Sequence, residues 1–166
     1  MNFTLVEAQE MDVPGILEIL NHEIIHSTAL YEYEKRTITQ QEEWFNEKQK
    51  SNNPVLVVKT GEKVLGFGTF GSFRPRPAYQ YTIEHSVYVH HAYQGQGIGN
   101  LLLEELIKQG KSQGYHSMMA VIDSSNDLSI MFHEKFGFQK VGELKEVGYK
   151  FDSWLDLTMM QLLLGD

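Results

Sequence analysis

The chain carries Gln94-Gly95-Gln96-Gly97-Ile98-Gly99 between two segments of different periodicity. The segment before it, Tyr79 to Val89, is rich in β-branched and aromatic residues, which is typical of a strand. After it, apolar residues recur at helical spacing, at Ile98, Leu101, Leu102, Leu106 and Ile107. A glycine-rich turn that leads into a helix exposes backbone N–H groups beside a partial positive charge. The pattern therefore predicts a cradle for phosphate oxygens.

Two common nucleotide-binding motifs do not fit this turn. A P-loop ends in Gly-Lys-Ser/Thr, whereas Gly99 is followed by Asn100 and Leu101. A dinucleotide fingerprint needs its third glycine at position 100 and an acidic residue about 20 positions later, where the chain reads Met118-Met119-Ala120. A ligand-free tight connection would not need three glycines, because each costs about 1 kcal/mol of backbone entropy against alanine. The anion cradle is the favoured interpretation.

The remaining pattern, Gln-x-x-Gly-x-Gly, resembles the pyrophosphate loop of the GNAT N-acetyltransferases. Residues 81–89, Tyr-Thr-Ile-Glu-His-Ser-Val-Tyr-Val, and residues 150–157, Lys-Phe-Asp-Ser-Trp-Leu-Asp-Leu, resemble the phosphinothricin and methionine sulfoximine/sulfone acetyltransferase subgroup. The resemblance covers nearly the whole chain and is sharpest from about residue 64 to 157. It implies acetyl-CoA as co-substrate, with the pyrophosphate on the loop amides and the pantetheine arm along the preceding strand. The implied cofactor-binding residues are Val87, Tyr88, Val89, Gln94, Gly95, Gln96, Gly97, Ile98, Gly99, Asn100 and Asn126.

Composition bounds the class of protein and its partners. The 166 residues are most simply one domain, 1–166, with an ordinary share of apolar and charged residues. A net charge of −8 argues against nucleic acid or an anionic membrane surface as partner. The absence of cysteine excludes disulfides, a thiol nucleophile and thiolate metal ligands. With no signal peptide and no apolar run of about 18 residues, a cytoplasmic enzyme is expected.

The pattern of elements predicts an α/β (α+β) chain. Asp12 is expected to cap a first helix that contains Pro14, and Thr39 with Glu42 a second. A helix follows the glycine turn, and Ser125 or Asn126 caps a short fourth one. Strands are expected near 3–8, 54–60, 63–73, 79–89, 117–123, 138–147 and 150–163. The order matches the GNAT fold, a mixed central sheet of about seven strands flanked by about four helices.

Glu84 is the candidate general base. On a strand of period two it shares a face with Thr82, Ser86 and Tyr88, opposite Ile83 and its neighbours. An attacking ammonium must lose a proton, and a carboxylate whose pKa is raised by partial burial accepts one directly or through water. The resembled family places its base here. The alternative is a solvated strand glutamate.

His133 occupies a position seven residues after Asn126, where many GNAT enzymes have a tyrosine that protonates the departing CoA thiolate. The phosphinothricin subgroup has histidine there, by resemblance. His133 is therefore a candidate catalytic acid, although a role as base or simple packing on the short helix stays open. The other histidines show no spacing for a metal site, and His90 and His91 are expected to point to opposite faces of a strand.

Arg74-Pro75-Arg76 forms a loop in which two arginines are held by neighbouring prolines. A guanidinium binds a carboxylate bidentately, and the loop resembles the carboxylate-binding loop of the subgroup. A plain surface loop is the alternative. Tyr31 and Tyr33 fall in the region that covers the acceptor site, with core packing equally favoured. The implied substrate-binding residues are Tyr31, Phe73, Arg74, Pro75, Arg76, Glu84, His85 and Ser86.

Together these features predict an N-acetyltransferase that moves the acetyl group of acetyl-CoA to the α-amine of a small amino-acid-like acceptor. The deprotonated amine is expected to attack directly, without a metal. Rival interpretations are acetylation of a protein N-terminus or a polyamine, and a CoA-binding regulatory module without turnover. A homodimer is expected, and apolar residues such as Met159, Met160 and Leu164 could pack across its interface or finish a core strand.

Overall fold

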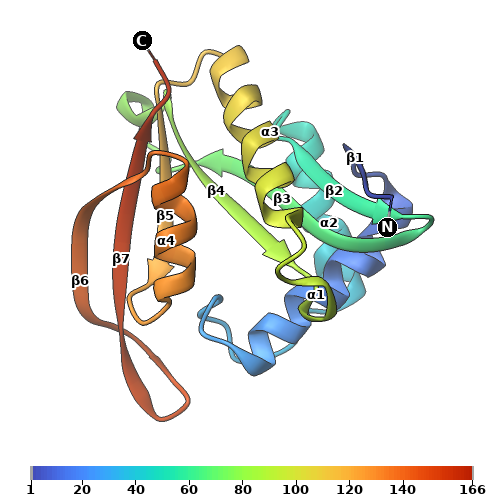
Figure 1. Ribbon diagram of the computed structural model, residues 1–166, viewed down its shortest axis with the longest axis horizontal. Coiled ribbons are helices and arrows are strands. Elements are labelled where there is room, and N and C mark those ends of the chain that lie inside the picture. Colours follow the sequence, from blue (N-terminus) through green and yellow to red (C-terminus); the bar gives the residue numbers. More distant parts are fainter. Residues whose placement is uncertain (1, 166) are drawn as a thin grey trace.

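The computed structural model describes residues 2–165, which form one seven-stranded mixed sheet with four α-helices (Figure 1). The strand order is β1-β2-β3-β4-β5-β7-β6. The strands are β1 Thr4–Glu7, β2 Val55–Thr60, β3 Lys63–Ser72, β4 Thr82–Val89, β5 Ser117–Asp123, β6 Gln139–Lys150 and β7 Ser153–Leu163. The helices are α1 Val13–His26, α2 Ile38–Lys50, α3 Ile98–Ser112 and α4 Asp127–Lys135. This is the predicted fold class.

Two apolar cores fix the helices to opposite faces of the sheet (Figure 1). On one face, the stripe of α3 that includes Leu102 and Leu106 packs against β2, β3 and β4. On the other, Ile16 and Leu20 of α1 pack with Phe45 of α2 over β2 and β3. Burying such amphipathic faces supplies most of the free energy that holds helices on a sheet.

The sheet is interrupted in its middle. β4 and β5 run parallel but pair only through Thr82, Glu84 and the residue between them, opposite 117–119. β4 continues to Val89 and β5 to Asp123 without further pairing to each other, while β3 stays paired with β4 as far as Val89. The two halves of the sheet therefore diverge beyond Glu84. One backbone edge of β4 is left free there.

Two predicted helix starts need correction. The second helix is capped by Thr37, whose hydroxyl accepts from the Gln40 N–H while the Gln40 side chain accepts from the Thr37 N–H. The predicted capping box at Thr39 and Glu42 is therefore wrong by two residues. The side chain of Gln40 fills the capping-box position for which the prediction chose Glu42, since glutamine accepts the N-cap hydrogen bond as glutamate does. Asp12 does precede α1, but its buried carboxylate accepts from the Gln9 N–H and pairs with Lys59 instead of capping the helix.

The fourth strand is shorter than the sequence predicts. Residues Pro77–Tyr79 form a 3₁₀ turn, and the strand starts only at Thr82. The proline restricts φ and removes a ladder donor, so the aromatic residues beside it cannot extend the strand. At the other end of the chain, β6 continues to Lys150, beyond the expected end at 147, and β7 begins only at Ser153, after the expected start at 150. The two strands form a hairpin that projects from the sheet (Figure 1).

The last strand completes the core. Met160 and Leu164 are buried in the apolar core around α3, whereas Leu163 is exposed. Met160 and Leu164 are therefore core residues and do not form part of a dimer interface. No helix in residues 2–165 is both long and apolar enough to span a membrane.

Candidate active site

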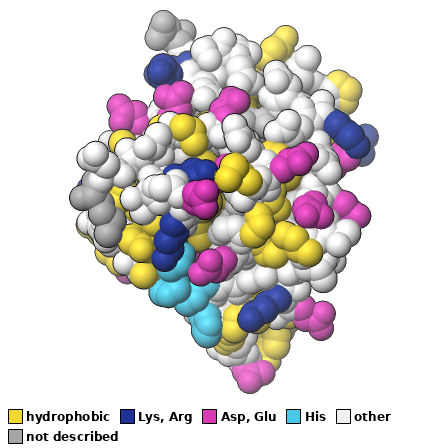
Figure 2. Space-filling view, turned by 90° about the vertical axis from the view of Figure 1, so that its right-hand side faces the viewer, with side chains coloured by type: hydrophobic (Ala, Val, Ile, Leu, Met, Phe, Trp, Pro, Cys, Tyr) yellow, Lys and Arg dark blue, Asp and Glu magenta, His cyan; other side chains and the backbone are white. Residues whose placement is uncertain are grey.

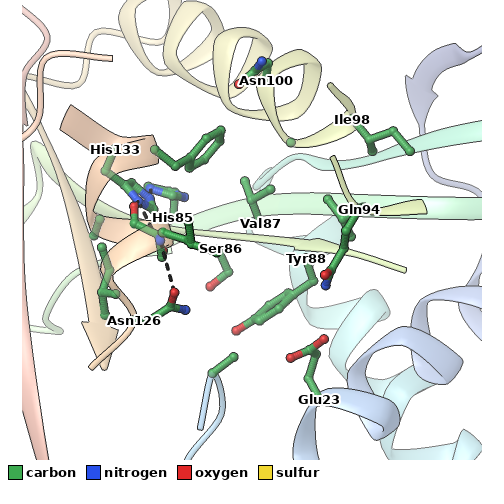
Figure 3. A pocket seen from close by; sticks show the side chains of 18 of the residues that line it. Glu23, His85, Ser86, Val87, Tyr88, Gln94, Ile98, Asn100, Asn126 and His133 are labelled. Atoms are coloured by element: carbon green, nitrogen blue, oxygen red, sulfur yellow. Dashed lines mark hydrogen bonds between the residues drawn. The ribbon is translucent and has the colours of Figure 1, made fainter. Parts of the chain in front are cut away.

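A cavity of about 570 Å³ fills the gap where β4 and β5 diverge. It extends from the glycine turn at the start of α3 to the segment after α1 and the start of α4 (Figure 3). Its lining residues are Glu23, Ala29, His85, Ser86, Val87, Tyr88, Val89, Gln94, Gly95, Gly97, Ile98, Gly99, Asn100, Ala120, Val121, Ile122, Asp123, Asn126, Leu128, Ser129, Phe132 and His133.

The glycine turn has the geometry of an anion cradle. Gly95 and Gly97 have φ values of 74° and 82°, and a Cβ on either would meet no atom within 4 Å. Gly97 is the N-cap of α3, and the buried Ile98 anchors the first turn of that helix in the core. Glycine is therefore required by the backbone conformation, and the open side of the turn faces the cavity. These amides fit the diphosphate of a CoA-like ligand.

The predicted cofactor-binding residues lie together around this one cavity. All of them line it except Gln96. The strand residues Val87 to Val89 stand on the free edge of β4, where an extended ligand arm can add to the sheet like a strand. Asn126 is the N-cap of α4, and its side-chain oxygen accepts from the Ser129 N–H, which confirms the predicted cap.

His85 and His133 form a buried pair in the cavity wall (Figure 3). His133 Nδ1 lies 2.7 Å from the Ser129 carbonyl oxygen and must donate to it, so a neutral His133 has a bare Nε2. His85 Nε2 lies 3.1 Å from that atom and is the donor. Burial lowers the pKa of His85 to about 3 and also lowers that of His133. Near neutral pH the pair is therefore uncharged.

The segment between α1 and α2 closes one end of the cavity. The Tyr31 hydroxyl donates to the Asp123 carboxylate at 3.2 Å, and burial together with that carboxylate raises the pKa of Tyr31 to about 12. Tyr31 therefore contacts a lining residue without lining the cavity. Glu23 at the end of α1 points toward Tyr88 from below (Figure 3). Burial raises the pKa of Tyr88 to about 12.

Glu84 does not line the cavity. It is half-buried on β4, on the opposite face of the sheet from His85 and on the same face as Ser86, which does line the cavity. Burial raises the pKa of Glu84, and the ammonium of Lys48 from α2 opposes that rise. The structure thus gives Glu84 the partial burial expected of a base. It lies one strand repeat away from the cavity wall.

The arginine loop lies outside the cavity. Residues 73–76 follow β3 at the end of β4 that is remote from the glycine turn, and none of them lines the cavity. Arg74 is exposed, and its guanidinium lies 5.3 Å from the Phe73 ring centroid. The substrate-binding set is therefore divided, with His85 and Ser86 in the wall and the loop beyond it.

Histidines gather in one surface patch (Figure 2). The rings of His22 and His91 stack with centroids 3.9 Å apart, and His90 stacks on the other side of His91. The His26 ring lies tilted beside His22. The expectation that His90 and His91 point to opposite faces of a strand is wrong, because β4 ends at Val89 and His90 is the N-cap of a 3₁₀ turn that begins at His91, so that the two rings stack. In the part of the chain that the structure describes, no group of three or more potential ligands could hold a metal.

Part of the cavity wall escapes sequence reasoning. The missed residues are Glu23, Ala29, Ala120, Val121, Ile122, Asp123, Leu128, Ser129 and Phe132. A signal existed for the β5 residues, because the carboxyl ends of neighbouring parallel strands meet at one edge of a sheet. No sequence motif marks Glu23 or Ala29, which line the cavity because the last turn of α1 and the segment after it lie against it.

Comparisons with known proteins agree with this geometry. Residues 19–138 match the family model described as the acetyltransferase (GNAT) family. The chain is 39% identical over 163 residues to the L-methionine sulfoximine/L-methionine sulfone acetyltransferase of Salmonella typhimurium, covering 98% of this chain and 95% of that protein.

Two solved structures are close in fold and sequence. An N-acetyltransferase from Staphylococcus aureus Mu50 superposes with a TM-score of 0.98 at 48% identity, covering 99% of this chain and 100% of that one. A phosphinothricin acetyltransferase from Sinorhizobium meliloti in complex with acetyl-CoA gives 0.95 at 32%, covering 99% and 90%. The family model spans well over half of the chain, and both solved structures match its fold over 99% of its length. This chain belongs to the GNAT acetyltransferase family.

Proposed function

We propose that this chain is an acetyl-CoA-dependent N-acetyltransferase for the α-amine of a small amino-acid-like acceptor of the methionine sulfoximine, methionine sulfone or phosphinothricin type. The observation that carries the proposal is the cavity between β4 and β5, which joins a free strand edge to a glycine cradle at the start of α3. The names of the relatives support the class of acceptor.

The chain's own groups divide the binding task. The amides from Gln94 to Asn100 would hold the diphosphate, and the free edge of β4 at Val87 to Val89 would align the pantetheine arm. Bound acetyl-CoA supplies the acetyl group as a thioester. Backbone N–H groups on the same edge would donate to the thioester carbonyl oxygen, where negative charge develops as the amine attacks.

Glu84 is proposed as the general base. Burial raises its pKa toward the range in which a carboxylate accepts a proton from an ammonium group. Because its side chain lies one strand repeat from the cavity wall, we propose that the proton reaches it through a water molecule beside Ser86. The attacking amine then has the lone pair that it needs.

His133 is proposed as the acid for the departing thiolate only when the His85–His133 pair carries an extra proton. In the neutral pair, the Nε2 atom of His133 accepts from His85 and has no proton to give. Since burial lowers both pKa values, this contribution belongs to acidic pH. Near neutral pH, the thiolate would leave without a proton from His133.

The acceptor subsite is proposed at the end of the cavity formed by Glu23, Ser86 and Tyr88, below the segment that contains Tyr31. The carboxylate of Glu23 would bind the acceptor ammonium before that ammonium loses its proton. Arg74 and Arg76 are the proposed partners of the acceptor carboxylate, because a guanidinium binds carboxylates bidentately. They would reach it from outside the cavity wall.

The test is a thiol-release assay with acetyl-CoA and a panel of amino acids, including methionine sulfone, methionine sulfoximine and phosphinothricin. Wild type should release CoA with members of this panel, and Glu84→Gln should lower kcat by at least about a hundredfold, as expected for general base catalysis. Glu18→Gln, a carboxylate on α1, is the matched control. Tight acetyl-CoA binding without release on any amine would instead indicate a regulatory CoA-binding module.

A second candidate acceptor is a polyamine. Glu23 and Asp123 line the cavity, and no lysine or arginine is among its described lining residues. Such a wall attracts cations. Spermidine and an N-terminal peptide therefore belong in the same assay, and a preference for spermidine over methionine sulfone would favour this candidate.

We further propose a cytoplasmic homodimer. Residues of β6, β7 and their connecting turn expose large apolar side chains on the projecting hairpin, which favours a protein contact over solvent. The most exposed of these side chains belong to Val141, Val147, Phe151, Trp154 and Leu163. Light scattering on the purified protein should give about twice the mass of the chain, and Trp154→Glu should shift it to the monomer.

A further inference from the structure

We propose that Lys48 is a positioning residue that keeps Glu84 ionised for proton transfer, and that Gly71 provides the space in which it does so. The inference rests on the proposed role of Glu84 as base. It concerns two residues to which no part of the mechanism above assigns a function.

The register of the sheet places Gly71 beside Glu84. Gly71 on β3 is the direct cross-strand partner of Glu84 on β4. Side chains of directly opposed residues in an antiparallel pair lie on the same face, with Cβ atoms about 4.5–5.5 Å apart. A Cβ built on Gly71 would lie 3.0 Å from the Lys48 Nζ atom. The ammonium therefore occupies the position beside Glu84 that a larger residue at 71 would fill.

Lys48 is held in this place from two sides. Its Nζ donates to the carbonyl oxygen of Phe70 at 3.0 Å. It also lies 5.9 Å from the ring centroid of Trp44, one helical turn earlier on α2. The side chain is thus directed inward at the end of the helix, where a lysine would ordinarily extend into water.

The ammonium is not neutralised by an ion pair. Among residues 2–165, no carboxylate lies within 4.0 Å of Lys48 Nζ, and the Phe70 carbonyl is its one hydrogen-bond acceptor. Burial lowers the pKa of Lys48, while the charge of Glu84 raises it. Its positive charge therefore acts on Glu84 without forming an ion pair, so the carboxylate oxygens stay free to accept a proton.

No other charged group competes at Glu84. Its cross-strand partners, Gly71 on β3 and Met119 on β5, are not titratable, and Lys48 is the one ionisable group whose charge shifts its pKa. Burial alone would raise the pKa of Glu84 and leave it partly protonated. The ammonium lowers that pKa, so more of Glu84 is available as a base at a given pH.

The direct test is a titration of Glu84 by NMR of ¹³C-carboxyl-labelled glutamate, assigned with Glu84→Gln. In Lys48→Met, which keeps the apolar stem over Trp44, the midpoint should rise by about one pH unit, the low end for loss of a nearby opposite charge. Lys48→Arg should restore the wild-type midpoint. Identical midpoints in wild type and Lys48→Met would overturn the proposal.

Gly71 supplies an independent variant. Gly71→Ala should displace the ammonium and raise the Glu84 midpoint in the same direction, by less. Gly142→Ala is the matched control, because a Cβ on this strand glycine meets no atom within 4 Å. If Lys48→Met does not fold, Lys48→Gln and Gly71→Ala carry the test, and an unchanged midpoint in both overturns it.

Kinetics separate this inference from the proposed function. In an active enzyme, the acidic limb of kcat/KM should move to higher pH in Lys48→Met and return in Lys48→Arg. A purely structural role would lower kcat/KM at every pH without moving the limb, which would count against the proposal. Absence of thiol release with every acceptor would refute the proposed function, while the NMR midpoints would still decide whether Lys48 controls Glu84.

Discussion

The ammonium of Lys150 donates to the carbonyl oxygen of Leu30 at 2.7 Å, and to that of Ser27 at the same distance. Lys150 ends β6 and its side chain is almost fully buried, whereas Leu30 belongs to the segment between α1 and α2. One side chain therefore ties the segment beside the proposed acceptor end of the cavity to the projecting hairpin. Neither carbonyl belongs to a regular element that could satisfy it otherwise.

Lys150→Met should release this segment. Hydrogen bonds from a charged donor contribute about 1.5–3 kcal/mol, so we expect the free energy of unfolding to fall by roughly 2–3 kcal/mol. Hydrogen exchange of residues 27–31 should accelerate, and the acceptor KM should rise more than the acetyl-CoA KM. Lys111→Met, an exposed lysine on α3, should change none of these. Equal exchange rates in both variants would show that the tie is not needed.

Gly97→Ala should weaken acetyl-CoA binding selectively. The residue has positive φ and lines the cavity at the proposed diphosphate site, so a Cβ costs about 1–2 kcal/mol of strain and takes space in the proposed cradle. Isothermal titration should give a Kd at least about tenfold higher, which corresponds to ~1.4 kcal/mol. Gly61→Ala is the matched control, because Gly61 also has positive φ and free space but lies in the β2–β3 turn. A similar loss of affinity in both variants would contradict the cradle.

The buried histidine pair should make the protein acid-sensitive. Burial lowers the pKa of His85 to about 3, so between about pH 6.5 and 3 the unfolded chain binds a proton that the native state does not. Stability should therefore fall as the pH decreases through this window, by up to about 1.4 kcal/mol per pH unit. Urea unfolding at pH 7, 6 and 5 measures the slope. His85→Asn should flatten it, and the exposed His116→Asn should not.

Arg74→Ala should separate the two substrates. Loss of one charge-assisted contact to a carboxylate costs about 1.5–3 kcal/mol, so the acceptor KM should rise by roughly tenfold or more while the acetyl-CoA KM stays constant. Lys35→Ala removes an exposed charge elsewhere and serves as control. A parallel rise in both KM values would mean that the loop does not form a separate acceptor subsite.

The fold follows from sequence to the extent that the pattern is local. The glycine turn, its helix and the hairpin across Gly61 were predicted because turn chemistry and period are set by neighbouring residues. The sequence predicts the cap of the second helix two residues too late, because Thr39 with Glu42 matches the capping-box pattern as well as Thr37 with Gln40 does. The start of β4 was placed too early because aromatic residues favour a strand, whereas Pro77 opposes one.

The site was predictable where one segment carries it. The glycine turn and the strand before it were found as a unit, because their residues are adjacent in the chain. Lys48, Glu23 and Lys150 come from distant elements and look like ordinary surface charges. Only tertiary packing turns them inward. The Ser129 carbonyl sets the tautomer of His133 locally, whereas that of His85 depends on the contact with His133, 48 residues away in sequence.

Because only three residue pairs join β4 to β5, a ligand arm lying along the free edge of β4 would act as a missing rung between the two halves of the sheet. Binding of acetyl-CoA would then connect the two halves of the sheet as well as supply the acetyl group. Those amides at the carboxyl ends of β4 and β5 that face the gap, and are not paired with β3 or β7, should exchange readily in the empty protein and become protected when CoA binds. The stability of the contact between the two halves of the sheet would therefore depend on whether the co-substrate is bound.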